Sequence, residues 1–148
     1  MKILLRAYAP ADFDTLYDID QACYEPAIAY SKRELRNYLR FPGSDCIVAE
    51  TNRKLVGFIL TAHQDDWGYI ITIDVLERFR RQSVGSLLLA RAEQHLKTDG
   101  VREIALETAI DNASAIAFWH RHGYRTGGIR KRYYPGGRDA YSMAKLLA

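Results

Sequence analysis

The feature that most constrains the fold is a strand-like run that continues through a short basic turn into a periodic helix. Residues 69–76 are mainly apolar, residues 79–86 read FRRQSVGS, and residues 87–96 place apolar side chains at helical spacing. A shorter strand pattern, with alternating Ile104 and Leu106, follows at residues 103–107. A strand, a helix and a strand in this order predict a parallel crossover within a sheet that helices cover.

The basic turn has the chemistry of an anion site. The first turn of a helix leaves backbone N–H groups without internal partners and carries a partial positive charge, so a diphosphate can dock there. Gly85 allows a close backbone approach to such a ligand. The segment lacks the Lys-Ser/Thr ending of a nucleoside triphosphate loop and has one glycine where a dinucleotide fingerprint needs three. The alternative from these residues alone is an ordinary strand-to-helix turn with two solvated arginines.

The remaining pattern predicts a single α/β domain over residues 1–148 with a mixed sheet and helices on both faces. Ser31, with Glu34 three residues later, predicts a helix N-terminus with a capping box. The expected order is βααβββαβαββ, with strands at 2–7, 46–50, 55–63, 69–76, 103–107, 124–129 and 140–145, and helices at 10–22, 31–40, 84–98 and 111–121. Ligands in open sheets favour the carboxyl ends of parallel strands, where the basic turn lies.

Composition excludes several classes of partner. A formal charge of +3 is too mild and too dispersed to indicate nucleic-acid binding. Cys23 and Cys46 have neither metal-ligand spacing nor disulfide density, and His120 and His122 face different sides of a helix, so no metal site is expected. No signal peptide or membrane-spanning run is apparent, and a cytoplasmic protein without a membrane partner is expected.

The chain resembles the GCN5-related N-acetyltransferase (GNAT) family, whose acetyl-coenzyme A motif is Arg/Gln-x-x-Gly-x-Gly/Ala. Residues 80–85 read RRQSVG at that place. The more specific segments lie downstream: DNASAIAFW at 111–119, Gly123 with Tyr124, IRKRYYP at 129–135 and DAYSM at 139–143. These are similar to the branch that acetylates protein N-termini, including the ribosomal-protein alanine acetyltransferases. The resemblance covers essentially the whole chain.

The resemblance implies an acetyl-CoA-dependent N-acetyltransferase that acts on the α-amino group of a protein or peptide, such as a ribosomal protein, by direct transfer in a ternary complex. An acetyltransferase of small-molecule or lysine amines and a non-catalytic acyl-CoA-binding regulatory domain stay open, because a fold alone does not fix its substrate. A monomer or homodimer is expected.

The resemblance also implies a set of cofactor residues. The strand backbone before the turn should pair with the pantetheine amides and polarise the thioester carbonyl, the turn and helix start should receive the diphosphate, and the next helix should flank the pantetheine arm. Asn112 either bonds that arm or caps its helix, and Phe118 is expected to pack at the helix base rather than stack on adenine. The full set is Ile73, Asp74, Val75, Arg80, Arg81, Gln82, Ser83, Val84, Gly85, Ser86, Asn112, Phe118 and Trp119.

Glu107 aligns with the catalytic glutamate of that branch and is the expected base, with a solvated carboxylate at the strand end as the alternative. Tyr69 is expected to hold a water for amine deprotonation or to be a core tyrosine, because it shares a strand face with Ile71 and Ile73. Tyr133 and Tyr134 are expected to flank the peptide entrance or to pack on the sheet edge. Glu25 is an amine-facing residue or a surface loop charge.

Two positions depart from the family pattern. Ser83 occupies the first glycine position of the motif, so the turn must either keep φ negative there or accept strain. Trp119 occupies the position of the tyrosine that serves as general acid, and an indole cannot protonate a leaving thiolate. That role then passes to Tyr134, Tyr124 or a water, or the thiolate leaves unprotonated, since a thiol has a pKa of only about 8.5.

Overall fold

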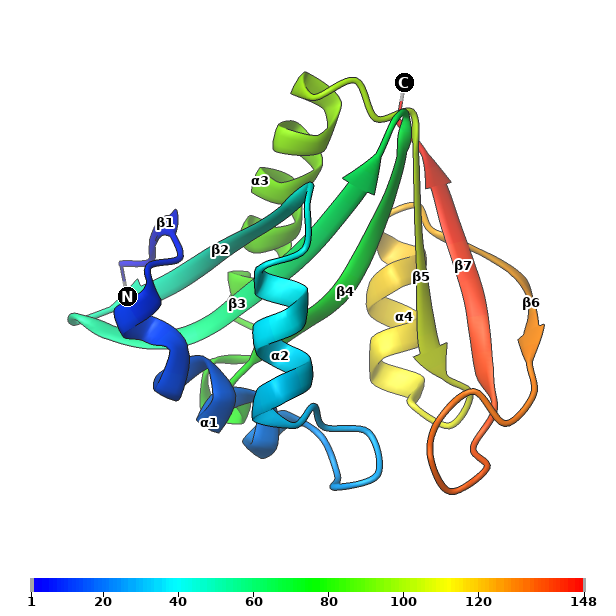
Figure 1. The fold of residues 1–148 in the computed structure, drawn as a ribbon, viewed down its shortest axis with the longest axis horizontal. Helices are drawn as coiled ribbons and strands as arrows, with labels where there is room; N and C mark the ends of the chain where they lie inside the picture. The colour runs from blue at the N-terminus through cyan, green and yellow to red at the C-terminus, as the bar shows by residue number, and fades with distance from the viewer. Residues whose placement is uncertain (1, 148) are drawn as a thin grey trace.

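The computed structural model describes residues 2–147, which form one seven-stranded mixed sheet in the order β1-β2-β3-β4-β5-β7-β6 (Figure 1). The strands are β1 Leu4–Ala7, β2 Ser44–Thr51, β3 Lys54–Gln64, β4 Trp67–Val75, β5 Glu103–Ala109, β6 Arg125–Arg130 and β7 Ala140–Leu146. The helices are α1 Phe13–Cys23, α2 Lys32–Leu39, α3 Val84–Thr98 and α4 Ala113–Arg121, with short 3-10 turns η1 Pro10–Asp12 and η2 Glu77–Phe79. The predicted element order and the predicted mixed α/β class are confirmed.

The helices cover both faces of the sheet and enclose two cores. Leu16 and Ile19 of α1 and Leu35 of α2 pack on one face, while Leu88 and Leu96 of α3 pack on the other. Each fully buried aliphatic side chain of this kind contributes about 1.5–3 kcal/mol relative to an exposed one. The sheet is therefore held between α1 and α2 in front and α3 and α4 behind (Figure 1).

Local capping fixes where α2 and α4 begin. The Ser31 hydroxyl accepts from the Glu34 N–H at 3.1 Å, and the Glu34 carboxylate accepts from the Ser31 N–H at 2.9 Å, which confirms the predicted capping box. Asn112 caps α4 by accepting from the Ala115 N–H at 3.2 Å. These two short motifs set the entry direction of both helices.

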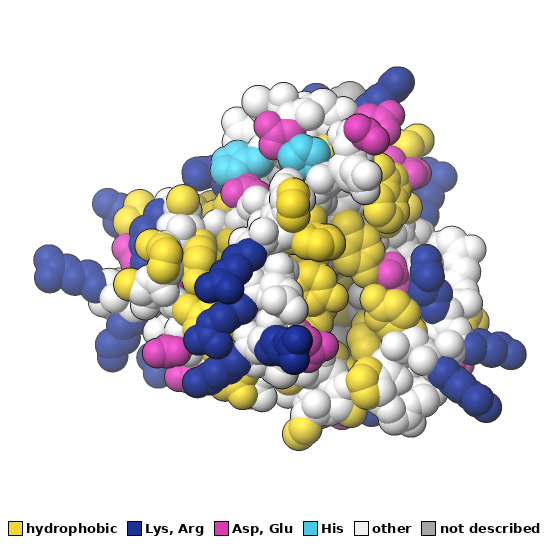
Figure 2. Space-filling view, in the orientation of Figure 1, with side chains coloured by type: hydrophobic (Ala, Val, Ile, Leu, Met, Phe, Trp, Pro, Cys, Tyr) yellow, Lys and Arg dark blue, Asp and Glu magenta, His cyan; other side chains and the backbone are white. Residues whose placement is uncertain are grey.

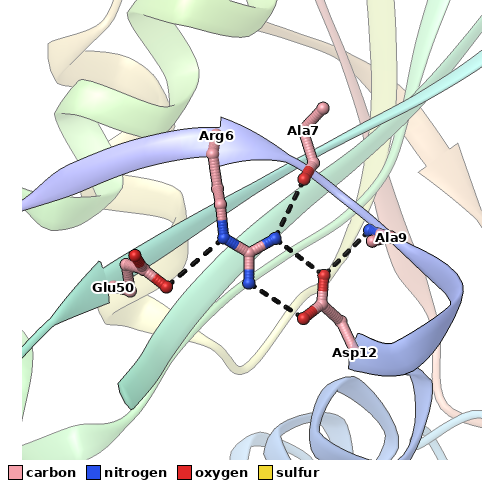
Figure 3. A network of polar contacts seen from close by, with 5 residues as sticks. All are labelled: Arg6, Ala7, Ala9, Asp12 and Glu50. Atoms are coloured by element: carbon pink, nitrogen blue, oxygen red, sulfur yellow. Dashed lines mark hydrogen bonds and ion pairs between the residues drawn. The ribbon is translucent and has the colours of Figure 1, made fainter. Parts of the chain in front are cut away.

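An ion-pair network anchors the N-terminal end of α1 to the sheet (Figure 3). The Arg6 guanidinium on β1 donates to both Asp12 carboxylate oxygens at 2.9 Å and to Glu50 on β2 at 3.3 Å. Asp12 also accepts from the Ala9 N–H at 2.8 Å. The Arg6 hydrogen bonds hold the pKa of Asp12 below its usual value, so this network stabilises the fold above the unfolded-state pKa and is lost as the pH falls.

The strands β4 and β5 separate part-way along their length. Their parallel pairing joins Trp67–Tyr69 to Glu103–Ala105 and does not continue, and the two strands diverge toward the start of α3 (Figure 1). The predicted parallel crossover is confirmed at this pair. The backbone of β4 after Tyr69 is therefore free of β5 on that edge.

One strand boundary differs from its prediction in a way that matters for the site. The strand expected at residues 103–107 extends to Ala109, because Thr108 and Ala109 pair with Tyr141 and Ala140 of β7. Glu107 thus lies inside a paired strand instead of at its end. Its backbone is held by β7, which fixes the direction of its side chain.

No helix among residues 2–147 is both long and apolar enough to cross a membrane. Positively charged side chains gather over α2, and hydrophobic side chains lie across the middle of the same face (Figure 2). Helix α2 carries three basic residues, Lys32, Arg33 and Arg36.

Candidate functional site

Glu107 and two tyrosines form a hydrogen-bonded group at the point where β4 and β5 diverge. The Tyr69 hydroxyl donates to Glu107 Oε1 at 2.6 Å and lies 3.2 Å from the Tyr133 hydroxyl. Tyr69 is partly buried, and burial together with the bond to Glu107 raises the pKa of its phenol far above the usual value. Tyr69 is therefore a neutral donor to Glu107 at any physiological pH. The prediction that Tyr69, Ile71 and Ile73 share one strand face is wrong at Ile73. The register of β4 against β3 skips Ile71, so Ile71 packs against the core that contains Leu60 and Ile73 against the core that contains Ile59.

The connection between β6 and β7 supplies Tyr133 and Tyr134. The Tyr134 N–H donates to the Arg138 carbonyl and its own carbonyl accepts from the Gly137 N–H, both at 3.0 Å. Gly136 and Gly137 have φ values of 90°, which a residue with a side chain adopts at a cost. This turn stacks the Tyr134 ring edge-to-face on Tyr133, with centroids 4.9 Å apart. Burial raises the pKa of both phenols.

A three-residue ion-pair chain connects the loops on either side of this group. Arg138, before β7, pairs with Glu25 in the loop between α1 and α2, and its Nε lies 3.6 Å from Asp111 at the end of β5. All three side chains are partly exposed. Glu25 is thus tied to the loop that carries Tyr134, across the front of the cluster around Glu107.

Beside the divergence, one edge of β4 has backbone groups that are not paired with another strand. The Leu76 N–H donates to Val56 of β3, so in this antiparallel pair the alternate residues Ile73 and Val75 point their N–H and carbonyl groups away from β3. The Tyr24 hydroxyl donates to the Ile73 carbonyl at 3.0 Å, and Arg80 Nε donates to the Val75 carbonyl at 2.8 Å. The Asp74 side chain is buried next to Asp20 of α1.

The basic turn is strained in two places. Arg81 and Ser83 have φ values of 61° and 68°, in the left-handed region. The structure thus resolves the alternative at Ser83 in favour of strain, at a cost of roughly 1–2 kcal/mol per residue with a side chain. Arg80 turns back to β4, and Gln82 donates to the Arg78 carbonyl at 3.2 Å, whereas Arg81 extends into solvent.

The first turn of α3 faces α4. The first helical N–H bond runs from Leu87 to the Ser83 carbonyl, so the N–H groups of Val84, Gly85 and Ser86 precede the hydrogen-bonded ladder. A Cβ on Gly85 would lie 3.2 Å from the Phe118 ring. The Ser86 hydroxyl lies 3.0 Å from His122 Nε2, and burial lowers the pKa of that imidazole. The turn therefore offers backbone donors beside a neutral histidine and an aromatic ring.

Trp119 and Tyr124 lie in the core behind this turn. Trp119 is 5% exposed and packs edge-to-face on Tyr124, with ring centroids 5.2 Å apart. The Tyr124 hydroxyl donates to Glu93 of α3 at 2.7 Å, and Glu93 also pairs with Lys145 at 3.0 Å. The Tyr124 hydroxyl, one of the three candidates for the general acid, is thus bonded to Glu93 in the core. Phe118 packs on Trp119 and His122, as expected for the helix base.

Sequence reasoning missed Tyr24, Arg138 and Asp20, and it named Asp74 only as part of the β4 backbone, without its side-chain partner. Tyr24 adjoins Glu25, but nothing in the local pattern shows that its hydroxyl reaches β4. Arg138 follows two glycines in the same turn as Tyr134, and that proximity is the signal that could have found it. Within residues 2–147, no group of three or more His, Cys, Asp or Glu side chains is placed to hold a metal ion.

Comparison with known proteins gives consistent matches. Residues 13–124 match the family model described as the acetyltransferase (GNAT) family. An N-alpha-acetyltransferase of Saccharolobus solfataricus is 30% identical over 125 residues, which is 74% of each chain. The ribosomal-protein-S18-alanine N-acetyltransferase of Escherichia coli superposes with a TM-score of 0.89 at 26% identity, covering 99% of this chain and 95% of that one. Ard1 of Thermoplasma volcanium superposes with a TM-score of 0.90 at 26% identity, covering 100% and 99%.

Proposed function

Because the chain belongs to the acetyltransferase (GNAT) family, we propose that it moves the acetyl group of acetyl-CoA directly to the α-amino group of a peptide or protein. The observation that carries the proposal is the 2.6 Å bond from Tyr69 to Glu107 at the divergence of β4 and β5. That bond orients a carboxylate beside the edge of β4 that β5 leaves free.

The residues present fit a coenzyme A arm. The N–H groups of Ile73 and Val75 point away from β3 and can pair with amide carbonyls as a neighbouring strand would. The N–H groups of Val84 to Ser86 can receive the diphosphate, with Arg81 free in solvent to add charge. The absence of a side chain at Gly85 lets the first turn of α3 pack closely against Phe118. When bound, acetyl-CoA supplies an activated acetyl thioester.

The chain's own groups then supply orientation, polarisation and a proton acceptor. A β4 N–H donates to the thioester oxygen and stabilises the negative charge that develops there. Glu107 accepts a proton from the amine, directly or through a water that the Tyr69 and Tyr133 hydroxyls hold. Tyr134, held neutral by burial, is the phenol that remains to protonate the leaving thiolate. Trp119 provides packing in the core and no proton.

Direct transfer, without an acetyl-enzyme intermediate, agrees with the protonation state of Cys23, the thiol next to the end of β4. Cys23 Sγ lies 3.5 Å from the Val75 carbonyl, beside the expected thioester position. Burial raises the pKa of Cys23 to about 11, so it is a thiol near neutral pH. A thiol is a poor nucleophile, because the thiolate is the reactive form. Cys23 is therefore unsuited to carry a covalent acetyl intermediate.

The residues proposed to bind the amine acceptor are acidic or aromatic, which suits a peptide N-terminus. Glu107 and Glu25 supply negative charge for an ammonium group, and Tyr133 and Tyr134 supply a rim for the following residues. The relative from Saccharolobus solfataricus is named an N-alpha-acetyltransferase and the Escherichia coli structure is of an S18-alanine N-acetyltransferase. These names support an α-amine acceptor, and a ribosomal protein as one candidate substrate.

A matched pair of peptides tests the proposal. One peptide carries a free N-terminus and no lysine, and the other has a blocked N-terminus and one internal lysine. We expect release of coenzyme A thiol with the first peptide and at least tenfold less with the second. Equal release with both peptides, or release only with small amines, would show that the acceptor is assigned wrongly.

A further inference from the structure

Two carboxyl groups that the reaction does not use are buried between α1 and β4. Asp20, in the last turns of α1, has 0% of its surface exposed, and Asp74, near the end of β4, has 1% exposed. Asp20 Oδ2 accepts from the Tyr30 N–H at 2.8 Å, and Asp74 Oδ1 accepts from the Thr72 hydroxyl. The remaining oxygens, Asp20 Oδ1 and Asp74 Oδ2, have no partner within residues 2–147.

One proton satisfies both unpartnered oxygens. The two carboxyl groups lie within hydrogen-bonding reach of each other, and two buried carboxylates at that distance repel strongly. If Asp74 carries a proton on Oδ2, it donates to Asp20 Oδ1, and all four oxygens then have partners. Burial raises the pKa of Asp74 well above its usual value, and the adjacent Asp20 raises it further, which agrees with this assignment.

The pair sits beneath the contacts that join the loop between α1 and α2 to β4. Asp20 holds the Tyr30 N–H, and the Tyr30 hydroxyl donates to the Ile71 carbonyl at 3.3 Å. Tyr24 follows Asp20 by one helical turn and donates to the Ile73 carbonyl. Both ends of this loop are therefore bonded to β4 carbonyls that precede Asp74 in the strand.

We propose that Asp20 and Asp74 share one proton, and that this acid–carboxylate pair is a positioning element that holds the loop between α1 and α2, with Glu25, at the acceptor side of the active site. The positioning role rests on the proposed function, whereas the shared proton does not. Neither residue touches the reacting atoms. Loss of the proton places two adjacent negative charges under the loop and weakens its attachment to β4.

The surroundings supply little charge to compensate. The titratable groups around the pair are Cys23 in α1, Tyr24 and Tyr30 in the loop that follows, and Cys46 in β2. Burial raises the pKa of each, so all four stay neutral. Arg80 contacts Cys23 and directs its Nε to the Val75 carbonyl. Arg80 is the one cation among these neighbours, and no ion pair joins it to Asp20 or Asp74 in the part of the chain that the structure describes.

The shared proton has a defined effect on stability. The native state keeps a proton on Asp74 at a pH where the unfolded chain, with a pKa of about 3.9, has lost it. The contribution of the pair is therefore fully present at low pH and is lost as the pH rises toward the native pKa. Over that window this group alone raises the unfolding constant by about tenfold per pH unit.

Asp74→Asn, Asp20→Ala and the control Asp18→Asn on the exposed side of α1 separate the roles of the two carboxyl groups. In Asp74→Asn the new side-chain amide donates to Asp20 without titrating, so the unfolding constant of this variant should lose the rise of about tenfold per pH unit that the control keeps. Asp20→Ala removes both the acceptor of the Tyr30 N–H and the partner of Asp74. We expect it to raise the peptide KM about tenfold, with kcat and coenzyme A affinity within about threefold of the control.

Urea unfolding between pH 5 and pH 9, which tests the pair even without an active assay, is the first measurement. Parallel stability curves for Asp74→Asn and Asp18→Asn would overturn the shared proton, and an unchanged peptide KM in Asp20→Ala would overturn the positioning role. If Asp20→Ala fails to fold, Tyr24→Phe tests the positioning role, with the same rise in peptide KM expected and a selective loss of kcat contradicting it. Absence of peptide acetylation in the unsubstituted protein would refute the proposed function and leave the unfolding result standing.

Discussion

Replacement of Glu107 by Gln should slow acetyl transfer to a peptide by more than the simple loss of a proton acceptor in solution allows. An α-amino group has a pKa of roughly 8, so about a tenth of it is already neutral at pH 7. If Glu107 only collected that proton before the reaction, its loss would cost about tenfold. A base that accepts the proton as the C–N bond forms contributes about 10²- to 10⁴-fold.

The geometry favours the larger effect and predicts coupling to Tyr69. A 2.6 Å bond from a phenol to a carboxylate is charge-assisted, and such bonds contribute about 1.5–3 kcal/mol, or roughly 10- to 150-fold in rate. Tyr69→Phe should therefore cost about that factor when Glu107 is present. On the Glu107→Gln background the charge is gone, and the same substitution should cost at least about 1 kcal/mol less.

The assay is the initial rate of thiol release with a saturating peptide at several pH values. Glu103→Gln is the matched control, since Glu103 lies four residues earlier on β5, opposite Trp67, away from the cluster around Glu107. Coenzyme A affinity, measured by calorimetry, should stay the same in every variant. Additive effects of Tyr69→Phe and Glu107→Gln within about 0.5 kcal/mol, or a loss of only tenfold at pH 7 for Glu107→Gln, would refute the reasoning.

The other predictions concern the cofactor turn, the ion-pair chain of Arg138 and the core. Gly85→Asp should lower coenzyme A affinity at least a hundredfold, because its charge opposes a diphosphate, and should also lower the free energy of unfolding, because its Cβ would lie 3.2 Å from the Phe118 ring; calorimetry and urea unfolding would check both effects. Ser83→Gly should raise the free energy of unfolding by about 0.5–1 kcal/mol in urea, as relief of a φ of 68° exceeds the entropy cost of glycine. Arg138→Met should raise the peptide KM severalfold with kcat little changed, because it releases Glu25. Trp119→Tyr should leave kcat within about threefold if Tyr134 or water serves the leaving thiolate; a sharp rise would show that the missing phenol limits the rate.

Local sequence signals predicted the elements whose ends depend on neighbouring residues. The capping box of Ser31 and Glu34 and the helix Val84–Thr98 are determined within a few residues of each boundary, and both predictions are confirmed. The predicted strand around Glu107 is two residues short, because its extension depends on pairing with β7, more than thirty residues later in the chain. Local patterns carry no information on such distant pairing.

The candidate site shows the same limit. Glu107 and Tyr69 came from the family resemblance, and the structure places them 2.6 Å apart, although their roles stay predictions. Tyr124 is a candidate acid from the sequence, which does not show that its hydroxyl bonds Glu93 on α3. Asp20 and Asp74 are 54 positions apart in the sequence, and only the packing of α1 on β4 makes them a pair.

A crystal structure of the protein with coenzyme A and a short peptide would test the central assignment most directly. The account predicts the coenzyme A arm along Ile73 and Val75, and the peptide α-nitrogen within about 2.6–3.2 Å of the Glu107 carboxylate or linked to it through one water. An α-nitrogen held elsewhere, with Glu107 facing bulk solvent and no water between them, would contradict the assignment of Glu107 as the base.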